Sequence, residues 1–365
     1  MNAAPVRVGL IGFGYVGRVF HAPLIAGTPG VELAAVASSR GEAVRAALPG
    51  VALFDDPAAM IASGAADLIV VASPNDSHAA WAVAALEAGR DVVVEKPFAL
   101  TLDEARGVAA VARRTGRLLS VFHNRRWDSD FLSVRAAIGD GLVGRVAQFD
   151  SHFDRFRPQV RDRWREAAVP GAGIWYDLGP HLIDQALQLF GLPEAVEADL
   201  AILRDGGRAD DWAHAVLAYP RHRAILHAST LVAGGVARFS VHGDRGSIAK
   251  VLPDRQEAQL LDGVMPGSAG WGEDSDPLRV WDGDGASRDI AATSGDQRGF
   301  YRAIAAAVRG EGGNPVPPEQ AIAVMAVIEA GVVSAREGRR VALPLSDAER
   351  AAFASSIAPD LPLPA

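Results

Sequence analysis

The stretch Val6–Phe20 reads VRVGLIGFGYVGRVF and decides the fold. An apolar run ends at Gly12, and beyond Gly17 apolar residues continue at helical spacing, which predicts a strand, a tight turn and a helix. The turn carries the pattern G-x-G-x-x-G. Gly12 permits the turn, Gly14 lets the backbone approach a pyrophosphate, and Gly17 lets helix and strand pack closely. Because the helix N-terminus also offers N–H groups to phosphates, we interpret the stretch as a dinucleotide site rather than a simple glycine-rich turn.

Composition narrows the class of protein. The chain has 365 residues, of which 49% are hydrophobic and 22% charged, as expected for one large or two ordinary globular domains. It has no cysteine, which excludes disulfides and thiolate metal sites. A net charge of −8 without a basic block argues against nucleic acid or a membrane surface as partner. We find neither a signal peptide nor an apolar run that would span a bilayer, so we expect a cytoplasmic protein.

Strand and helix patterns alternate from the glycine turn to Phe122. Further strands are predicted at Val31–Ala37, Leu68–Ala72, Asp91–Val94 and Leu118–Phe122, with helices over residues 78–86 and 102–115. Short apolar runs of this kind are typical of parallel strands that are buried on both faces. We therefore expect an α/β chain whose first domain, residues 1–122, is a doubly wound Rossmann sheet.

The residues that follow the second strand predict the cofactor. Enzymes of this fold that prefer NAD place Asp or Glu there to bind the ribose 2′-hydroxyl. This chain has Ser38, Ser39 and Arg40, two hydroxyls and a guanidinium that suit a 2′-phosphate. We predict NADP(H), with NAD(H) as the alternative. The competing interpretation of Arg40 is a solvated surface charge.

Polar residues also end the later strands. They are Ser73-Pro74-Asn75, Glu95-Lys96-Pro97 and His123-Asn124. Since ligands bind at the carboxyl ends of parallel strands, we expect these segments to share one crevice with the glycine turn. Ser73 and Asn75 also suit a plain turn, and a histidine such as His78 often only packs or caps a helix, so we give His78 no catalytic role.

Lys96 follows a buried strand at the predicted crevice. Its ammonium is able to bind a substrate hydroxyl and to stabilise alkoxide character as a hydride leaves. Pro97 stiffens this backbone and is a candidate for a cis peptide bond. The alternative for Lys96 is a structural ion pair with Glu95.

Four motifs, in this order, resemble those of a known family. They are the glycine pattern near the start, SPNDSH at 73–78, EKPF at 95–98 and DLGPH at 177–181. Together they resemble the glucose–fructose oxidoreductase / inositol dehydrogenase / rhizopine-catabolism (Gfo/Idh/MocA) oxidoreductases over essentially the whole chain. The stretches 21–25, 122–128 and 163–166 are similar to the branch of NADP-dependent scyllo-inositol dehydrogenases.

From Gly144 the pattern changes to strands with one wet face joined by short turns, which predicts an antiparallel sheet. The strands are expected at 144–156, 195–203, 212–219, 224–231 and 236–242, with late helices at 300–308 and 319–336. The resemblance implies an α+β second domain, residues 123–365, whose late helices pack back on the first domain. It also implies an open sheet that forms an oligomer contact, so we expect a homodimer or homotetramer.

The helix expected over Trp175–Phe190 carries the chemistry of this second domain. Asp177 and His181 lie four residues apart and share a helix face, provided that Pro180 falls in the first turn or kinks the helix. An aspartate that fixes the imidazole tautomer leaves the other ring nitrogen to take a proton. The alternative is an ordinary surface pair, but the resemblance implies that Lys96, Asp177 and His181 are catalytic.

Further binding residues are expected at the glycine turn and the strand ends, and where charged and aromatic side chains suit a polyol. The candidates for the cofactor are Gly12, Phe13, Gly14, Tyr15, Val16, Ser38, Ser39, Arg40, Ser73, Pro74, Asn75, His78, Glu95, Lys96, His123, Trp164 and Arg165. The candidates for the substrate are His123, Arg125, Trp127, Asp154 and Arg157. The side chains proposed for the substrate also suit packing between domains. We expect no metal, because the sequence has no His/Cys cluster at ligand spacing.

Two biased segments remain. The Gly/Asp-rich stretch Asp262–Gly295 contains two tryptophans and is interpreted either as a surface excursion or as a loop that closes the pocket. The tail 359–365 is rich in proline.

The sequence thus predicts an NADP(H)-dependent oxidoreductase that interconverts a secondary alcohol of a cyclic polyol or sugar and its ketone. One alternative is an NAD-dependent glycosidase on the same fold, which would retain its cofactor tightly. Another is a cofactor-sensing regulator without catalysis, which the presence of all three reactive residues disfavours. Fold alone does not fix the substrate.

Overall fold

The structure is a computed structural model that describes residues 4–357, so the proline-rich tail lies outside the described residues. The chain forms two compact units. The first comprises Met1–Trp127, Arg255–Gly272 and Asp296–Ala321, and the second comprises Asp128–Asp254, Glu273–Gly295 and Ile322–Ala365. Both units are therefore built from segments that are far apart along the chain.

The first unit contains a six-stranded sheet with the order β3-β2-β1-β4-β5-β6, and all of its strand pairs are parallel. The strands are β1 (Val6–Ile11), β2 (Val31–Ala37), β3 (Ala52–Phe54), β4 (Leu68–Val71), β5 (Asp91–Val94) and β6 (Leu119–Val121). Every residue of β4 is buried, as expected for a strand covered on both faces. This confirms the predicted doubly wound sheet.

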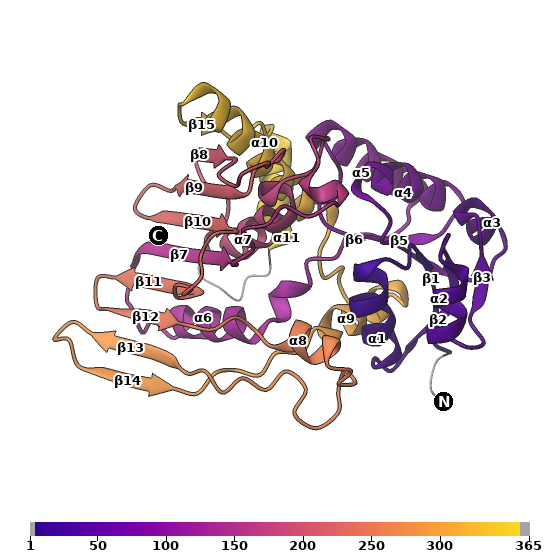
Figure 1. Cartoon of the computed structure of the whole chain (residues 1–365), viewed down its shortest axis with the longest axis horizontal. Coiled ribbons are helices and arrows are strands. Elements are labelled where there is room, and N and C mark those ends of the chain that lie inside the picture. The colour runs from indigo at the N-terminus through magenta and orange to yellow at the C-terminus, as the bar shows by residue number, and fades with distance from the viewer. Residues whose placement is uncertain (1–3, 358–365) are drawn as a thin grey trace. The chain divides into compact units, whose positions relative to one another are not determined.

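Helices cover both faces of this sheet. Figure 1 shows α4 and α5 above it and α1 and α9 below it. The helices are a π-helical turn (Gly17–His21) that continues into α1 (Ala22–Ala26), α2 (Gly41–Ala47), α3 (Pro57–Ala62), α4 (His78–Glu87), α5 (Leu102–Thr115), α8 (Gln256–Leu261) and α9 (Arg298–Val308), with 3₁₀ turns at Asn75–Ser77 and Asn124–Trp127. Thr101 caps α5 by accepting the Glu104 N–H, and Gly116 ends it in the left-handed region.

The second unit contains a nine-stranded sheet with the order β14-β13-β12-β11-β7-β10-β9-β8-β15. The strands are β7 (Val146–Asp154), β8 (Ala195–Ala201), β9 (Trp212–Ala218), β10 (Arg223–Ser229), β11 (Phe239–Gly243), β12 (Gly246–Lys250), β13 (Leu278–Asp282), β14 (Ser287–Ile290) and β15 (Val341–Ala342). Apart from the parallel pair of β7 and β10, the ladders are antiparallel. The predicted largely antiparallel sheet is confirmed.

This unit also contains helices. They are α6 (Ser129–Gly139), α7 (Ile174–Phe190), α10 (Pro318–Glu337) and α11 (Asp347–Ser356), with a 3₁₀ turn at Trp164–Glu166. Alternate residues of β7 such as Phe149 are buried beneath α7, while those between them are half-exposed. The indole N–H of Trp175 donates to the carbonyl of Ile328 at 3.1 Å, which ties α7 to α10.

Two expectations about the chain were wrong. Residues 278–290 are not loop but the hairpin β13–β14, which extends the large sheet by pairing β13 with β12. Leu278 and Val280 alternate as its buried residues, while β14 is almost wholly exposed and gave no strand pattern. The second wrong expectation is that no apolar run is long enough to span a bilayer. By length and composition Pro318–Glu337 is, but 72% of its most apolar window is buried, as in a core helix.

Candidate functional site

Of the three glycines in the turn, only Gly14 has open space around its Cα. Gly12 has φ +98°, and a Cβ there would lie 2.5 Å from the carbonyl oxygen of Ala72. A Cβ on Gly17 would overlap the carbonyl oxygen of Gly12. A Cβ on Gly14, in contrast, would meet no atom within 4 Å. Two glycines are thus required by the fold, whereas Gly14 keeps open the space that a pyrophosphate needs, so the turn fits a dinucleotide.

Ser38, Ser39 and Arg40 follow β2, next to the glycine turn, because β2 pairs with β1. The Ser38 hydroxyl accepts the backbone N–H of Arg40 at 3.0 Å and fixes this corner. Ser39 and Arg40 are exposed. Within residues 4–357 no carboxylate lies at ion-pair distance from Arg40, so its guanidinium is available to an anionic ligand.

The histidine of the SPNDSH motif connects two strand ends. The His78 ring nitrogens lie 2.8 Å from the carbonyl oxygen of Pro97 and 3.0 Å from that of Ser73. His78 is buried, and the hydroxyls of Ser73 and Ser77 are 2.6 Å apart. His78 therefore positions the loops after β4 and β5, which supports its structural interpretation.

The loop after β5 rests on a buried acid, Glu95, whose contact with His21 the sequence did not indicate. The Glu95 carboxylate lies 2.9 Å from His21 Nε2 and accepts the Lys96 backbone N–H at 2.9 Å, and the other His21 nitrogen is 2.5 Å from the Tyr301 hydroxyl. Burial disfavours ionisation of Glu95, but the hydrogen bond and charge of His21, together with the charge and backbone N–H of Lys96, outweigh it and hold the carboxyl pKa below its usual value. The Lys96–Pro97 bond is cis, as the sequence suggested.

Residues 123–127 end the first segment of this unit, and several have partners in its later segments. His123 and Asn124 are buried, and the Asn124 amide donates to Gln297 at 3.0 Å. Arg125 forms an ion pair with Glu257 at 2.9 Å. Trp127 packs edge-on against Phe300, with ring centroids 5.8 Å apart. Arg125 and Trp127 thus occupy positions that suit packing as well as binding.

Glu257 also accepts the Tyr15 hydroxyl at 3.0 Å, so α8 is held over the glycine turn.

In the second unit, Asp177 and His181 both lie in α7 and are separated by one turn. Pro180 falls inside the helix rather than in its first turn, which removes one backbone hydrogen bond there. His181 is buried, and its ring lies 6.3 Å from that of Phe153. The Asp177 carboxylate lies 3.5 Å from Nε of Arg165.

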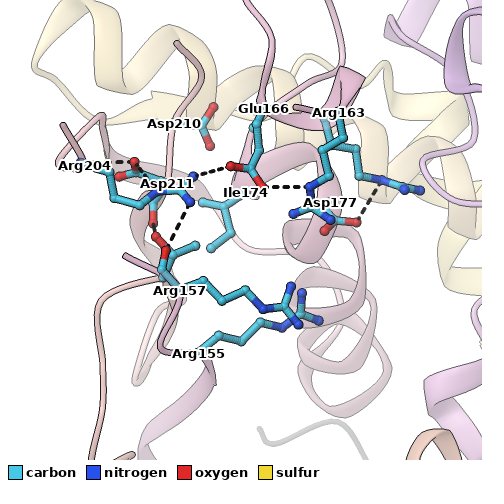
Figure 2. A pocket seen from close by; sticks show the side chains of 12 residues that line it. Arg155, Arg157, Arg163, Glu166, Ile174, Asp177, Arg204, Asp210 and Asp211 are labelled. Atoms are coloured by element: carbon cyan, nitrogen blue, oxygen red, sulfur yellow. Dashed lines mark hydrogen bonds and ion pairs between the residues drawn. The ribbon is translucent and has the colours of Figure 1, made fainter. Parts of the chain in front are cut away.

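Arginines and carboxylates line a pocket at the start of α7 (Figure 2). Its residues are Arg155, Arg157, Arg163, Arg165, Glu166, Gly173, Ile174, Asp177, Arg204, Asp210, Asp211 and Thr230. Arg163 and Arg204 pair with Glu166 at 2.7 and 3.1 Å, and Arg204 also pairs with Asp211 at 2.9 Å. The pocket wall is therefore a network of ion pairs, of which those of Arg204 are buried.

Two arginines of this pocket have no such partner. Figure 2 shows the guanidinium groups of Arg155 and Arg157 side by side beneath Asp177. No carboxylate of the described residues lies at ion-pair distance from either group. Partial burial and the charges of Arg155, Arg161 and Arg163 lower the pKa of Arg157. The site is thus built to accept oxygen atoms that carry negative charge or lone pairs.

Burial also disfavours the charged form of Asp210, another residue of this pocket. Burial raises its pKa to about 6, although it accepts the Trp175 N–H at 2.7 Å. A Cβ on Gly173 would overlap this carboxylate, so glycine is required at the start of α7.

The structure places the other candidates as follows. The Arg165 guanidinium lies over the Trp164 ring, 4.7 Å from its centroid. Asp154 ends β7, lies 3.1 Å from His152 Nδ1 and is not among the residues that line the pocket of Figure 2. The sequence reasoning missed Arg155, Arg204, Asp210, His21 and Glu257. Arg155 could have been found, because it lies two residues before Arg157 and so shares its side of an extended chain. The other four could not, because their roles depend on contacts between segments distant in the sequence.

Comparison with known proteins adds the family. Residues 6–123 match the profile of an oxidoreductase family with an NAD-binding Rossmann fold, and residues 135–343 match the C-terminal α/β domain of that family. The chain is 51% identical over 334 residues to the uncharacterised Escherichia coli oxidoreductase YdgJ, covering 91% of this chain and 96% of YdgJ. It is 34% identical over 343 residues to the Bacillus subtilis scyllo-inositol 2-dehydrogenase (NADP⁺) IolW, covering 93% and 96%. A Klebsiella pneumoniae crystal structure superposes with a TM-score of 0.92 at 52% identity, covering 98% of this chain and all of the other.

Proposed function

Because the chain belongs to the Gfo/Idh/MocA oxidoreductase family, we propose that it is an NADP(H)-dependent dehydrogenase of a cyclic polyol or sugar. It would interconvert a secondary alcohol and its ketone in the cytoplasm. The observation that carries the proposal is the open space at Gly14, in a turn whose other glycines are required by the fold. The relative named for NADP⁺ and scyllo-inositol supports it.

Ser39 and Arg40 support the choice of NADP(H), because the hydroxyl of Ser39 and the guanidinium of Arg40 are exposed beside the glycine turn. Ser38 is buried, and its hydroxyl holds this corner by accepting the Arg40 N–H. The other contacts to the cofactor would come from residues 12–16 and from the strand ends at 73–75, 95–96 and 123. Trp164 and Arg165 would lie near its reactive ring. When bound, the nicotinamide supplies the acceptor or donor of a hydride.

The residues of this chain would handle the proton and hold the substrate. We assign His181 as the base that takes the proton of the reacting hydroxyl, and Asp177 as the carboxylate that orients its ring. Lys96 would hydrogen-bond the same oxygen and stabilise its negative charge. His123, Arg125, Trp127 and Arg157 are proposed to hold the other oxygens and the ring of the polyol.

Arg155 and Arg157 extend the proposed substrate class. Two half-buried guanidiniums side by side repel one another, and an anionic group would remove that repulsion. We therefore propose that the pocket favours a polyol that carries a carboxylate or phosphate over its neutral counterpart.

A substrate panel tests these proposals. Inositols, aldoses and their acid and phosphate forms are incubated with NADP⁺ or NAD⁺, and the absorbance of the reduced cofactor is recorded. Turnover of a polyol with NADP⁺ is the expected result. Activity on a glycoside without added cofactor would favour the NAD-dependent glycosidase instead. Cofactor binding with no turnover on any member would favour a regulator.

We also propose a homodimer or homotetramer formed through the half-exposed face of the large sheet. Sedimentation of the purified protein checks this, and a monomer at micromolar concentration would contradict it.

A further inference from the structure

The large sheet carries a row of histidines on the face opposite α7. β7 and β10 run parallel with His152 directly beside His227, and β10 and β9 run antiparallel with His227 directly beside His214. The neighbouring residues of these strands, such as Leu226 and Ala228, point to the buried face. Three imidazoles from three adjacent strands therefore stand on the same side of the sheet (the strands are labelled in Figure 1).

Asp154 completes a set of metal-ligand types. It is two residues after His152 on the same face of β7, next to Ser229 of β10. Its carboxylate lies 3.1 Å from His152 Nδ1 and 3.7 Å from His227 Nε2. One ligand atom from each of the three residues lies within 4.8 Å of the others.

The Asp154 carboxylate is buried, although one of its oxygens accepts no hydrogen bond in the described part of the chain. Only 6% of the Asp154 side chain is exposed, and its Oδ1 has no hydrogen-bond donor among the described residues. A buried carboxylate oxygen without a donor is costly, and a cation between the three side chains would satisfy it. His227 Nδ1 is likewise buried without a partner in the described part of the chain.

We propose that His152, Asp154 and His227 bind a divalent transition metal such as Zn²⁺ or Ni²⁺. Two imidazoles and one carboxylate suit these metals, whereas Mg²⁺ and Ca²⁺ favour sites made of oxygen ligands. Three protein ligands leave a position for water or for a fourth ligand. His214, whose ring centroid is 5.5 Å from that of His227, is the nearest further imidazole. The site takes no part in the proposed hydride transfer, and it gives Asp154 a role other than substrate binding.

The sheet also provides a reporter. The Trp212 ring lies 5.4 Å from that of His227 and 6.0 Å from that of His214. Co²⁺, Ni²⁺ or Cu²⁺ bound at the cluster would quench the fluorescence of this tryptophan.

The test uses the full chain, stripped with a chelator and dialysed. Co²⁺ titration is followed by its visible absorption and by tryptophan quenching, and Zn²⁺ affinity is measured by competition with a chromophoric chelator. We expect one ion per chain, a higher melting temperature with metal, and affinity lowered about 100-fold in His227→Ala and His152→Ala. Trp212→Phe should remove most of the quenching while leaving affinity unchanged.

His242→Ala is the matched control. His242 lies on β11 of the same sheet, but its Nδ1 is engaged by Ser247 at 2.8 Å and it is not part of the cluster. Equal metal binding by wild type, His242→Ala and His227→Ala would overturn the proposal, as would the absence of binding below millimolar metal. Far-UV circular dichroism of each variant separates loss of the site from loss of the fold. Because no step measures dehydrogenase turnover, the result is independent of the proposed reaction.

Discussion

The two sheets of this protein use their surfaces in opposite ways. The parallel sheet of the first unit is covered on both faces, so its strands are almost wholly apolar and its chemistry is confined to the loops at the carboxyl ends. The large sheet of the second unit is packed on one face, and the other face carries half-exposed His, Asp and Trp side chains. A sheet covered on both faces offers a ligand only its edge, whereas a sheet covered on one face offers a whole surface.

The first prediction separates proton transfer, assigned to the second unit, from cofactor binding, assigned to the first. His181→Ala, in the second unit, should lower kcat about 1,000-fold, because the hydroxyl proton loses its acceptor. The dissociation constant for NADPH should stay within about twofold, since the glycine turn is untouched. Steady-state kinetics and a fluorescence titration with NADPH measure these quantities. Equal loss of turnover and cofactor affinity would show that His181 supports the fold instead.

The second prediction tests whether the glycines at the carboxyl edge of the parallel sheet serve the fold or the ligand. Gly12→Ala should lower the free energy of unfolding by about 3 kcal/mol, because φ is positive and the new Cβ meets the Ala72 carbonyl.

Gly14→Ala is its matched control. The new Cβ meets no atom of the protein, so stability should change by less than about 0.5 kcal/mol while NADPH affinity falls. If both variants unfold alike, the open space at Gly14 is not reserved for a ligand. Thermal melts and NADPH titrations decide between these outcomes.

The third prediction concerns pH and the second unit. The raised pKa of Asp210, about 6 against 3.8, means that the folded state binds its proton more tightly than the unfolded state. This group therefore contributes stability below pH 4 that is lost as the pH rises through 6, by about 3 kcal/mol. Asp210→Asn should remove that part of the pH dependence. Urea unfolding of both proteins between pH 4 and 7 measures the difference, and parallel profiles would contradict it.

His222 should act in the opposite direction. Burial, and the charge of Arg223, lower its pKa from 6.5 to about 4, so it stabilises the folded state above pH 6.5 and loses that contribution as the pH falls through 4. Its ring stacks on Tyr219 at 4.2 Å. His222→Gln should flatten the acid side of the profile, where Asp210→Asn steepens it. The same slope change in both variants would refute the assignment.

The smallest expected effect lies at the edge of the parallel sheet. Arg40→Ala should lower the ratio of kcat/KM with NADP⁺ to that with NAD⁺ about 10-fold, since one charge-assisted contact to the 2′-phosphate is lost. Ser39→Ala should change this ratio less. An unchanged ratio in Arg40→Ala would leave this residue a solvated surface charge.

The sequence predicted five of the six strands of the parallel sheet because these are short apolar runs, but it missed the edge strand Ala52–Phe54, which has no buried residue. The strand at Asp91–Val94 and the helix at Leu102–Thr115 have the predicted bounds. The hairpin β13–β14 was missed because Ser287–Ile290 is exposed on both faces, so its residues do not alternate. Pairing with β13 rather than burial makes it a strand.

The candidate site was predictable only in part. Lys96, Asp177 and His181 belong to short motifs that are visible in the sequence. The contact of His21 with Glu95 joins residues 74 positions apart, and the one of His152 with His227 depends on the register of two strands. No local pattern encodes such contacts, which appear only when the strands are paired.

The division of the chain into two units has a consequence for biosynthesis. The polypeptide passes between the units after Trp127, Asp254, Gly272, Gly295 and Ala321. A ribosome that has released residues 1–127 has therefore delivered only part of the first unit, which must await the segments ending at Ala321 before it is whole. Translation of nearly the entire message precedes completion of either unit, so a nascent chain exposes unfinished apolar surface for most of its synthesis and is a natural client of chaperones.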